Sequence, residues 1–368
     1  MTLSRRKMLG LISGGTILAA TGGTAAFVTT RTPNAALAPW DAAGSYADPR
    51  MRALSYALLA PNPHNRQPWE AELIGETEVA IWRDPARDLP VTDPFGRQLT
   101  IGMGCFLELM DMAAAEEGIA VETVLFPEGE DGPVALCTFD PGGAMPNPLF
   151  AHAMSRRSHK ESFDDRTVGA EAAPLEAYAQ VFLGGSEVDV LRRLAHDAWM
   201  AEARSPAAWQ ESVDLIRIGK AEINAQPDGI DVGGPMMEAL ALAGLFTREA
   251  AADIDNAGTR GVIEAMAEAV NAAPAFTLNV TPANTRADQI AAGRSWLRLN
   301  LSATGAGLAL RPVSQALQEY PEVAPYHDEI HARFAPNGET VQMLGLLGYG
   351  ARTPRTPRWP LETRMRNG

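Results

Sequence analysis

The 368-residue sequence has few of the residues that build disulfide frameworks or metal sites. It contains only two cysteines, Cys105 and Cys137, too few for a disulfide framework or a zinc site with four thiolates. The six histidines are scattered without metal-binding spacing, so we predict no metal site. Lysine and arginine together number 31 against 45 aspartates and glutamates, a formal net charge of −14. Because phosphate backbones are bound by an excess of basic residues, this balance predicts no nucleic-acid partner and disfavours anionic lipid.

The N-terminus has the layout of an export signal. Ser4-Arg5-Arg6-Lys7-Met8-Leu9-Gly10 is basic, and a weakly apolar run rich in Gly, Ala and Thr follows up to about Val28. Paired arginines before x-hydrophobic-Leu resemble the twin-arginine type, which carries folded proteins with their cofactors already loaded. Ala36-Leu37-Ala38 is a small-x-small cleavage site, but Pro39 after it would hinder cleavage. We predict export through the twin-arginine translocase, to the periplasm or the outer face of the cytoplasmic membrane, with the leader either removed or kept as a tether.

Composition and periodicity divide the rest of the chain into two units. The predicted boundaries are 1–44 for signal and linker, 45–148 for a first lobe and 149–368 for a second lobe. In the first lobe, apolar spacing from Gln98 to Gly118 predicts a helix, and the runs 121–125 and 134–138 predict a hairpin. The second lobe contains an Ala/Met-rich stretch at about 228–255, which is either a lid or a buried helix. It ends in a Pro-rich basic arm, either a solvated end or an arm that closes over an anion.

The two halves contain a weak repeat. Residues 104–118 align with residues 293–307 at a constant offset of 189 (293 − 104), and apolar positions coincide along both segments. Two unrelated amphipathic helices that end in glycine would align as well, because glycine suits the position after a helix. Duplication and coincidence therefore both remain open.

Two short motifs carry the chemistry. Ala60-Pro-Asn-Pro-His-Asn-Arg-Gln-Pro-Trp69 cannot continue a helix, because each proline lacks an N–H and fixes φ. It is either a helix-to-strand turn with Trp69 buried, or a rigid turn that presents amide groups to a flat polar ligand. Arg156, Ser158 and Lys160 occupy alternate positions, which share one face of an extended segment. Two cations and a hydroxyl on one face form either a phosphate site or a solvated basic surface.

Together with Leu347-Gly-Tyr-Gly350 and the basic arm, these motifs resemble the nitroreductase-like flavoprotein family, most of all its Acg type. The spacing departs slightly from the family pattern, since two residues separate Lys160 from Phe163. The resemblance implies bound FMN. It also implies an α+β fold in which two related α/β lobes, with mixed or antiparallel sheets flanked by helices, form a pseudo-dimer.

The family motifs are divided between the halves of this chain. The Asn-x-Gln-Pro-Trp motif lies only in the first half, and Arg-x-Ser-x-Lys and the basic arm lie only in the second. The resemblance therefore implies a monomer with one FMN at a composite site. The implied FMN-binding residues are Pro61, Asn62, Pro63 and Asn65 at the ring, Arg156, Ser158, Lys160 and Arg358 at the phosphate, and Ser314 near the flavin N5 and O4.

Other polar residues near the motifs have structural interpretations. We expect Gln67 and Trp69 to be structural, and Asp93 and Arg97 to form a cap and a salt bridge, with a flavin contact as the alternative. No catalytic side chain is nominated, because a flavin performs the redox chemistry itself.

The sequence leaves three functions open. The first is an FMN oxidoreductase that reduces a small planar acceptor, a quinone or nitroaromatic, with electrons from a donor that the sequence does not identify. The second is an FMN storage protein without turnover, in which the 228–255 stretch covers the flavin. The third is an acidic exported scaffold without a cofactor.

Overall fold

The computed structural model describes residues 30–366. The predicted twin-arginine motif therefore lies outside the described residues. Within residues 30–366, every helix is too short or too polar to cross a membrane.

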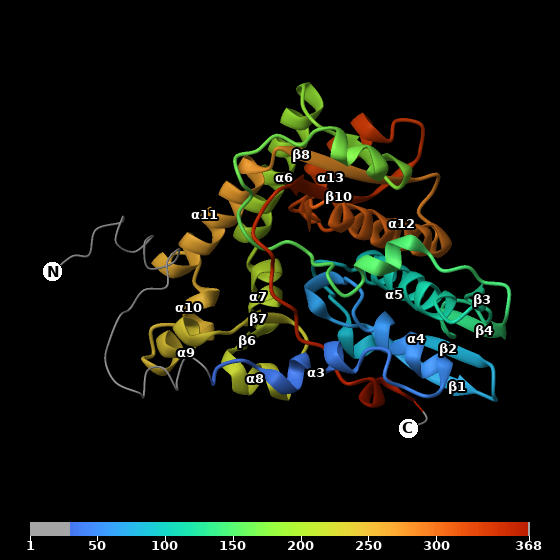
Figure 1. Cartoon of the computed structure of the whole chain (residues 1–368). Helices are drawn as coiled ribbons and strands as arrows, with labels where there is room; N and C mark the ends of the chain where they lie inside the picture. The colour runs from blue at the N-terminus through green and yellow to red at the C-terminus, as the bar shows by residue number, and fades with distance from the viewer. Residues whose placement is uncertain (1–29, 367–368) are drawn as a thin grey trace.

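The first lobe is built on a four-stranded antiparallel sheet with strand order β1-β2-β4-β3 (Figure 1). Its strands are β1 Trp69–Ile74, β2 Glu78–Arg83, β3 Ile119–Leu125 and β4 Ala135–Pro141. Helix α5, Arg97–Ala115, connects β2 to β3, and all but two of its residues are buried, including Arg97 and Glu108, which are ion-paired. The predicted helix and hairpin are therefore confirmed, with the helix ending three residues early.

The second lobe repeats this arrangement. Its sheet has the order β5-β8-β10-β9, again antiparallel, and helix α12, Arg286–Gly305, connects β8 to β9. Its strands are β5 Gln180–Phe182, β8 Ala275–Thr281, β9 Ala309–Pro312 and β10 Thr340–Gly348. Chain order and spatial order thus match strand for strand between the lobes, which confirms the predicted two-lobed α+β fold.

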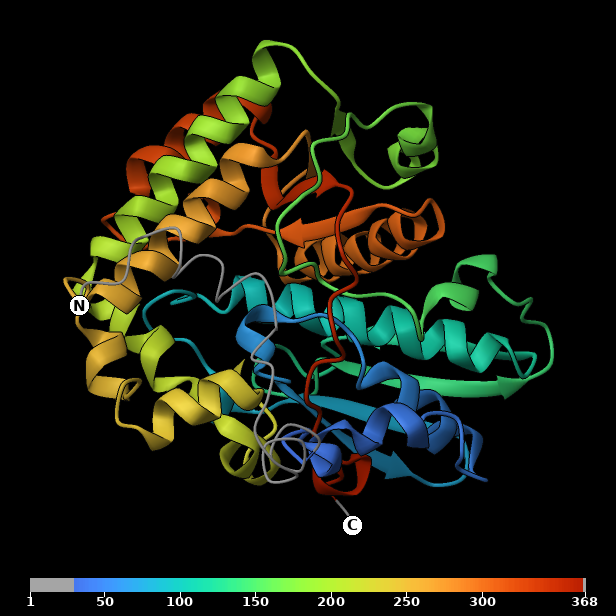
Figure 2. The ribbon, with the colours of Figure 1, turned by 60° about the vertical axis from the view of Figure 1, so that its left-hand side comes forward.

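Helices α5 and α12 pack side by side between the two sheets (Figures 1 and 2). A Cβ added to Gly104 would lie 2.2 Å from the Ile290 carbonyl oxygen, and one added to Gly293 would lie 2.0 Å from that of Ile101. These contacts are reciprocal, because 293 − 104 and 290 − 101 are both 189. Such exchange of equivalent contacts is what a twofold axis produces. One apolar core cluster includes buried residues of both lobes, so the lobes form one folded unit.

Between β5 and β8 the second lobe carries a large helical insert that extends toward the first lobe (Figure 2). Its elements are α6 Ser186–Arg204, α7 Pro206–Asp214, β6 Ile216–Ile218, α8 Gly219–Ala225, β7 Ile230–Val232, α9 Pro235–Leu242, α10 Arg248–Ala252 and α11 Ala257–Ala272. The predicted lid stretch spans β7, α9 and α10. The alternative of a buried helix is wrong for α9, since Leu242 is 78% exposed. A further helix, α13 Ala324–Phe334, precedes β10.

Residues 34–44 belong to the folded protein and not to a linker, which corrects the predicted boundary. They form α3, Asn34–Ala42, whose Trp40 is 1% exposed, and the next helix is α4, Pro49–Ala57. Asp48 caps α4 by accepting a hydrogen bond from the backbone N–H of Arg50. The linker prediction failed because α3 is weakly amphipathic and contains Pro39. Its packing depends on partners that are distant in sequence.

The C-terminal arm also departs from the predicted boundary. After β10 the chain leaves the second lobe and crosses to the first, where Met365 pairs with Ala71 of β1 (Figure 1). The backbone N–H of Arg366 donates to the Ala71 carbonyl oxygen at 2.8 Å. Residues 357–366 are therefore covalently part of the second lobe but pack on the first, whereas residues 349–353 still contact the second lobe. The alternative of a solvated end is wrong, because Arg358 in this arm is 3% exposed.

Candidate functional site

The Pro-rich segment after α4 forms a turn with an unusual backbone. His64, Asn65 and Gln67 have φ values of 46°, 52° and 51°, in the left-handed region that favours glycine. Non-glycine residues in this region cost about 1–3 kcal/mol each and persist where the surrounding structure over-determines them. Such strain gathers at ligand-binding sites, so the turn is a candidate wall of a binding site.

Buried hydrogen bonds fix this turn in place. The Gln67 amide donates to the Pro227 carbonyl oxygen at 2.7 Å and accepts from the Trp359 backbone N–H at 2.9 Å. The side chain of Asn62 accepts from the Gln67 backbone N–H at 2.7 Å. Gln67 and Trp69 are both fully buried. The structural role predicted for Gln67 is therefore confirmed by its contacts with the insert and the C-terminal arm.

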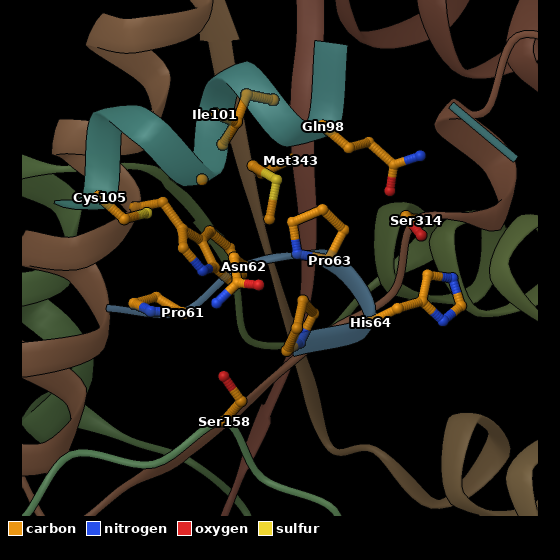
Figure 3. Close-up of a pocket in the computed structure, with 13 residues that line it drawn as sticks. Pro61, Asn62, Pro63, His64, Gln98, Ile101, Cys105, Ser158, Ser314 and Met343 are labelled. Atoms are coloured by element: carbon orange, nitrogen blue, oxygen red, sulfur yellow. The ribbon is translucent and has the colours of Figure 1, made fainter. Parts of the chain in front are cut away.

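One face of the turn lines a cavity of about 200 Å³ between the lobes (Figure 3). The other walls are largely apolar, with Ile101 and Cys105 from α5, Trp296 from α12 and Met343 from β10, and Gln98 of α5 adds an amide (Figure 3). Five of the predicted ligand-binding residues line it, namely Pro61, Asn62, Pro63, Ser158 and Ser314. An apolar cavity with a few convergent polar groups is typical of a small-molecule site. We call it the first cavity.

A second cavity of about 200 Å³ adjoins the first. The two cavities share the wall residues Pro61, Asn62, His64, Ser158 and Pro312. The remaining predicted residues, Asn65, Arg156, Lys160 and Arg358, line the second cavity. The chain thus brings all nine predicted residues, from both lobes and the arm, to the walls of two adjoining cavities.

Arg156 is a buried cation without a counter-charge. It is 3% exposed, and its guanidinium donates one hydrogen bond, from Nη2 to the Leu59 carbonyl oxygen at 2.8 Å. Its Nε and Nη1 have no hydrogen-bond partner. Burial lowers the pKa of Arg156 to about 10. Because an unpaired buried charge is costly, the two donors of this cavity-lining residue call for an anion.

Arg358 is the second buried cation of this cavity. Its guanidinium donates to the carbonyl oxygens of Leu58 at 2.7 Å and of Leu59 and Ala60 at 3.2 Å, and to the side-chain oxygen of Asn65 at 2.6 Å. Burial, reinforced by the like charge of Arg156, lowers the pKa of Arg358 to about 9. Among the described residues, neither arginine forms an ion pair. Two uncompensated charges therefore face the second cavity.

Lys160 lies differently from the two arginines. It is exposed, and its ammonium group pairs with Asp231 of β7 at 2.7 Å. Its role at an anion therefore requires the ammonium to be shared with, or released from, this carboxylate. The charges expected to be solvated, Glu161, Asp164 and Asp165, are exposed, as predicted.

Asp93 and Arg97 form the predicted cap and salt bridge. The Asp93 carboxylate accepts from the backbone N–H groups of Gln98 and Leu99 at 3.0 and 2.9 Å, and Arg97 pairs with Glu319 at 3.2 Å. Neither Asp93 nor Arg97 lines the two cavities. The alternative of a contact with the cavity ligand is therefore wrong.

The sequence did not nominate the other wall residues as ligand-binding, among them His64, Arg157 and Trp40. His64 lies inside the quoted motif and Arg157 beside Arg156, so both could have been found from their neighbours. Trp40 was missed because it was assigned to the leader and linker. No sequence pattern connects it to a motif more than a hundred residues away.

The described walls contain no carboxylate, and their titratable groups suit neither acid–base nor nucleophilic work. Burial raises the pKa of the Cys105 thiol to about 12, so the thiol is protonated near neutral pH. Burial lowers the pKa of His64, which favours its neutral form. That no side chain is catalytic stays a prediction.

Known proteins resemble the chain in parts. No protein-family model matches it. The Mycobacterium tuberculosis protein named as an NAD(P)H nitroreductase, acg, is 34% identical over 88 residues, 24% of this chain and 26% of the relative. A second M. tuberculosis protein named as an NAD(P)H nitroreductase is 33% identical over 78 residues, 21% of this chain and 22% of the relative. The chain thus matches about a quarter of the length of these curated relatives.

Two solved structures cover more of the chain at lower identity. The FMN-dependent nitroreductase NfnB from Mycobacterium smegmatis, solved with NADPH, is 18% identical and has a TM-score of 0.37. It covers 58% of this chain and 96% of its own. A nitroreductase-like family protein from Bacillus cereus is 13% identical with a TM-score of 0.33, over 61% of this chain and 97% of its own.

Proposed function

We propose that this chain is an FMN-binding oxidoreductase of the nitroreductase-like family, with one flavin site built by both lobes. The observation that carries the proposal is the pair of buried, uncompensated arginines, Arg156 and Arg358, beside an apolar cavity at the lobe interface. FMN joins a flat ring system to a phosphate, which matches a largely apolar cavity next to a cationic one. The partial sequence match to acg supports the same family.

The residues present fit this cofactor. Arg156 and Ser158 would hold the phosphate through hydrogen bonds, with Arg156 supplying the two N–H groups that lack partners. Arg358 would contribute its positive charge, because its own N–H groups already donate to protein oxygens. Backbone and side-chain groups at Pro61–Pro63 and at Ser314 would border the ring. A bound flavin would supply electron transfer, and the protein's part is to bind and orient it and to exclude water.

We also propose that the chain is a fused pseudo-dimer with one cofactor and not two. The position on α12 that corresponds to Cys105, 189 residues later, holds Arg294. Arg294 is ion-paired to Glu108 at 3.1 Å and to Asp111. These ion pairs occupy the place that a second, symmetric ring cavity would need. The reciprocal contact of α5 with α12 supports the fusion, and such a chain is expected to be a monomer.

The test is the absorbance spectrum of the purified chain, with flavin released by heat and counted per chain. We expect a flavin band near 450 nm and about one FMN per chain. Two FMN per chain would contradict the composite site. A folded, colourless protein that takes up no added FMN would overturn the proposal.

The substrate we propose is a small planar acceptor of the quinone or nitroaromatic class, able to stack in the first cavity. With export proposed through the twin-arginine route, the donor would be a quinol, a thiol or a partner protein, since NAD(P)H is scarce outside the cytoplasm. Reduction of bound FMN by NADPH at a rate that supports turnover would contradict a separate donor.

The second candidate function is FMN storage without turnover. It is motivated by Gly229 and Ile230, which line the second cavity where the predicted lid stretch begins. Stopped-flow reoxidation of chemically reduced protein by a soluble quinone distinguishes the two functions. Reoxidation within seconds supports the oxidoreductase, whereas bound flavin that stays reduced supports storage.

A further inference from the structure

We propose that α3 is part of the anion site and that Trp40 is the residue that positions its arginines. The inference rests on the proposed function for the identity of the ligand, a phosphate-bearing flavin. It assigns a binding role to the segment directly after the predicted export leader.

Trp40 lies at the centre of a cluster of arginines. It is 1% exposed and lines the second cavity. The guanidinium carbons of Arg157, Arg355 and Arg358 lie 4.5, 5.5 and 5.8 Å from the centroid of its ring. Cations within about 6 Å of an aromatic face are attracted to the ring. One side chain from α3 therefore holds cations from two segments that are distant in sequence.

These cations have little negative charge to oppose their mutual repulsion. Asp41, also on α3, pairs with Arg355 at 2.6 Å, whereas Arg157 and Arg358 pair with no described carboxylate. Burial, followed by the like charges of Arg156, Arg352 and Arg355, lowers the pKa of Arg157 to about 10. The tryptophan ring offsets only part of that repulsion, so the cluster is arranged to receive an anion.

Hydrogen bonds tie α3 to the arm that carries Arg358. The Trp40 indole N–H donates to the Thr356 carbonyl oxygen at 2.8 Å, and the Arg358 backbone N–H donates to the Ala36 carbonyl oxygen at 2.8 Å. The Ala36 backbone N–H donates to the Asn224 side chain of α8 at 3.0 Å. Helix α3 thus fixes the position of the arm between the first lobe and the insert, and with it the position of Arg358.

The test compares FMN with riboflavin, which has the same ring and ribityl chain without the phosphate. Dissociation constants are measured by flavin fluorescence in the full chain and in the variants Trp40→Leu and Trp40→Phe. Because Trp40 acts through the arginines, we expect Trp40→Leu to weaken FMN about 10-fold or more and to leave riboflavin unchanged. Trp40→Phe keeps a ring and most of the packing, and is expected to show a smaller loss with the same selectivity.

Trp82→Leu is the matched control, because Arg366 stacks on Trp82 at 4.1 Å on β2, away from both cavities. Trp82→Leu should change neither the FMN affinity nor the riboflavin affinity. Equal losses of FMN and riboflavin in Trp40→Phe would show a merely structural role and overturn the inference. Unchanged FMN affinity in Trp40→Leu would overturn it as well.

Inorganic phosphate separates this inference from the proposed function. We expect phosphate to raise the Tm of the ligand-free wild type and to raise that of Trp40→Phe less. If the wild type binds no flavin but shows this difference, the proposed function fails and the anion site stands. If phosphate raises both Tm values equally or neither, the role of Trp40 is wrong.

Discussion

At the scale of single residues, the site depends on charges that are buried without partners. Arg364 is also buried, but it has a counter-charge. It pairs with Asp84 at 2.8 Å and donates a hydrogen bond to the Trp69 carbonyl oxygen. Arg156 has neither a carboxylate nor partners for two of its donors. An unpaired buried charge opposes folding, so this arginine is better explained by a ligand than by stability.

This contrast predicts opposite effects for one substitution at two arginines. Arg156→Met should raise the free energy of unfolding of the ligand-free chain by about 1–3 kcal/mol, because it removes an unpaired buried cation. In this variant the Leu59 carbonyl oxygen loses the hydrogen bond from Arg156 but still accepts one from Arg358. The same variant should weaken FMN about 10- to 100-fold through loss of a charged hydrogen-bond donor.

The matched control is Arg364→Met, which should lower the free energy of unfolding by about 1–3 kcal/mol, because it removes a cation paired with Asp84 and leaves the Trp69 carbonyl oxygen without that donor. Urea unfolding and FMN titration of both variants provide the measurements. A destabilised Arg156→Met chain with unchanged FMN affinity would contradict the assignment.

The sequence predicted the residues of the site well because its motifs are local. In the Pro-rich turn and in the alternate positions 156, 158 and 160, neighbours along the chain remain neighbours at the cavity walls. Trp40 reaches the site only through α3, which packs against an arm more than three hundred residues later. No local periodicity encodes such a contact, so sequence reasoning missed it.

At the scale of elements, the crossing of α5 and α12 limits which residues fit. Gly104→Ala and Gly293→Ala each place a methyl group about 2 Å from a backbone oxygen of the other helix. Since backbone must shift to relieve such overlap, we expect each to lower the free energy of unfolding by about 1–3 kcal/mol or more.

Gly261→Ala in α11 is the control, because its Cβ would meet no atom within 4 Å. Helix propensity should make it stabilising by up to about 1 kcal/mol. Urea midpoints of the three variants check the prediction. Gly104→Ala with a midpoint at or above that of the wild type would show that the helices do not pack as closely as described.

The insert contributes a buried carboxyl group that contacts Gln315, the residue after Ser314. Glu202 of α6 is 3% exposed, accepts a hydrogen bond from Gln315 at 3.2 Å, and has one oxygen without a partner. Burial raises the pKa of Glu202 to about 7. The folded state then binds this proton more tightly than the unfolded state does. The contribution of Glu202 to the free energy of unfolding is therefore fully present below about pH 4.5 and is lost as the pH rises to about 7.

Wild-type chain should therefore lose about 2–3 kcal/mol of unfolding free energy from this group between pH 4.5 and 7.5. Glu202→Gln should remove that loss and be more stable than the wild type at pH 8, because the amide never ionises. Exposed Glu264 supplies the control, as Glu264→Gln should leave the pH dependence unchanged. Equal slopes for wild type and Glu202→Gln would show that Glu202 ionises normally in the fold.

Element types followed from sequence more readily than their placement. Apolar spacing predicted α5, and alternation predicted β3 and β4. The same periodicities say nothing of which strand neighbours which, so the insert between β5 and β8 was merged into the second lobe. The repeat at offset 189 was the informative exception, since equivalent glycines meet where two related helices cross.

At the scale of the whole molecule, the chain is held together by crossing segments. The C-terminal arm runs from the second lobe onto the first, and α3 packs against that arm and against α8 of the insert. The walls of the second cavity include residues from α3, the first lobe, the insert and the arm. The proposed anion site is therefore complete only when the ends of the described chain are in place.

This closure makes a prediction about processing at Ala36-Leu37-Ala38. Ala36 is 1% exposed within a helix, and peptidases require a locally extended segment, so cleavage there requires α3 to detach. We expect the exported protein to retain residues 34–42, with any cleavage upstream of α3. Intact-mass measurement of protein recovered from the exported fraction determines the N-terminus directly. A chain that begins at Pro39 and still binds FMN as tightly as the full chain would contradict both the prediction and the role of α3.

The Asn224→Ala variant removes the hydrogen bond from α8 to the Ala36 backbone. It should increase thermolysin cleavage within residues 34–42 of the purified chain, whereas added FMN should reduce that cleavage.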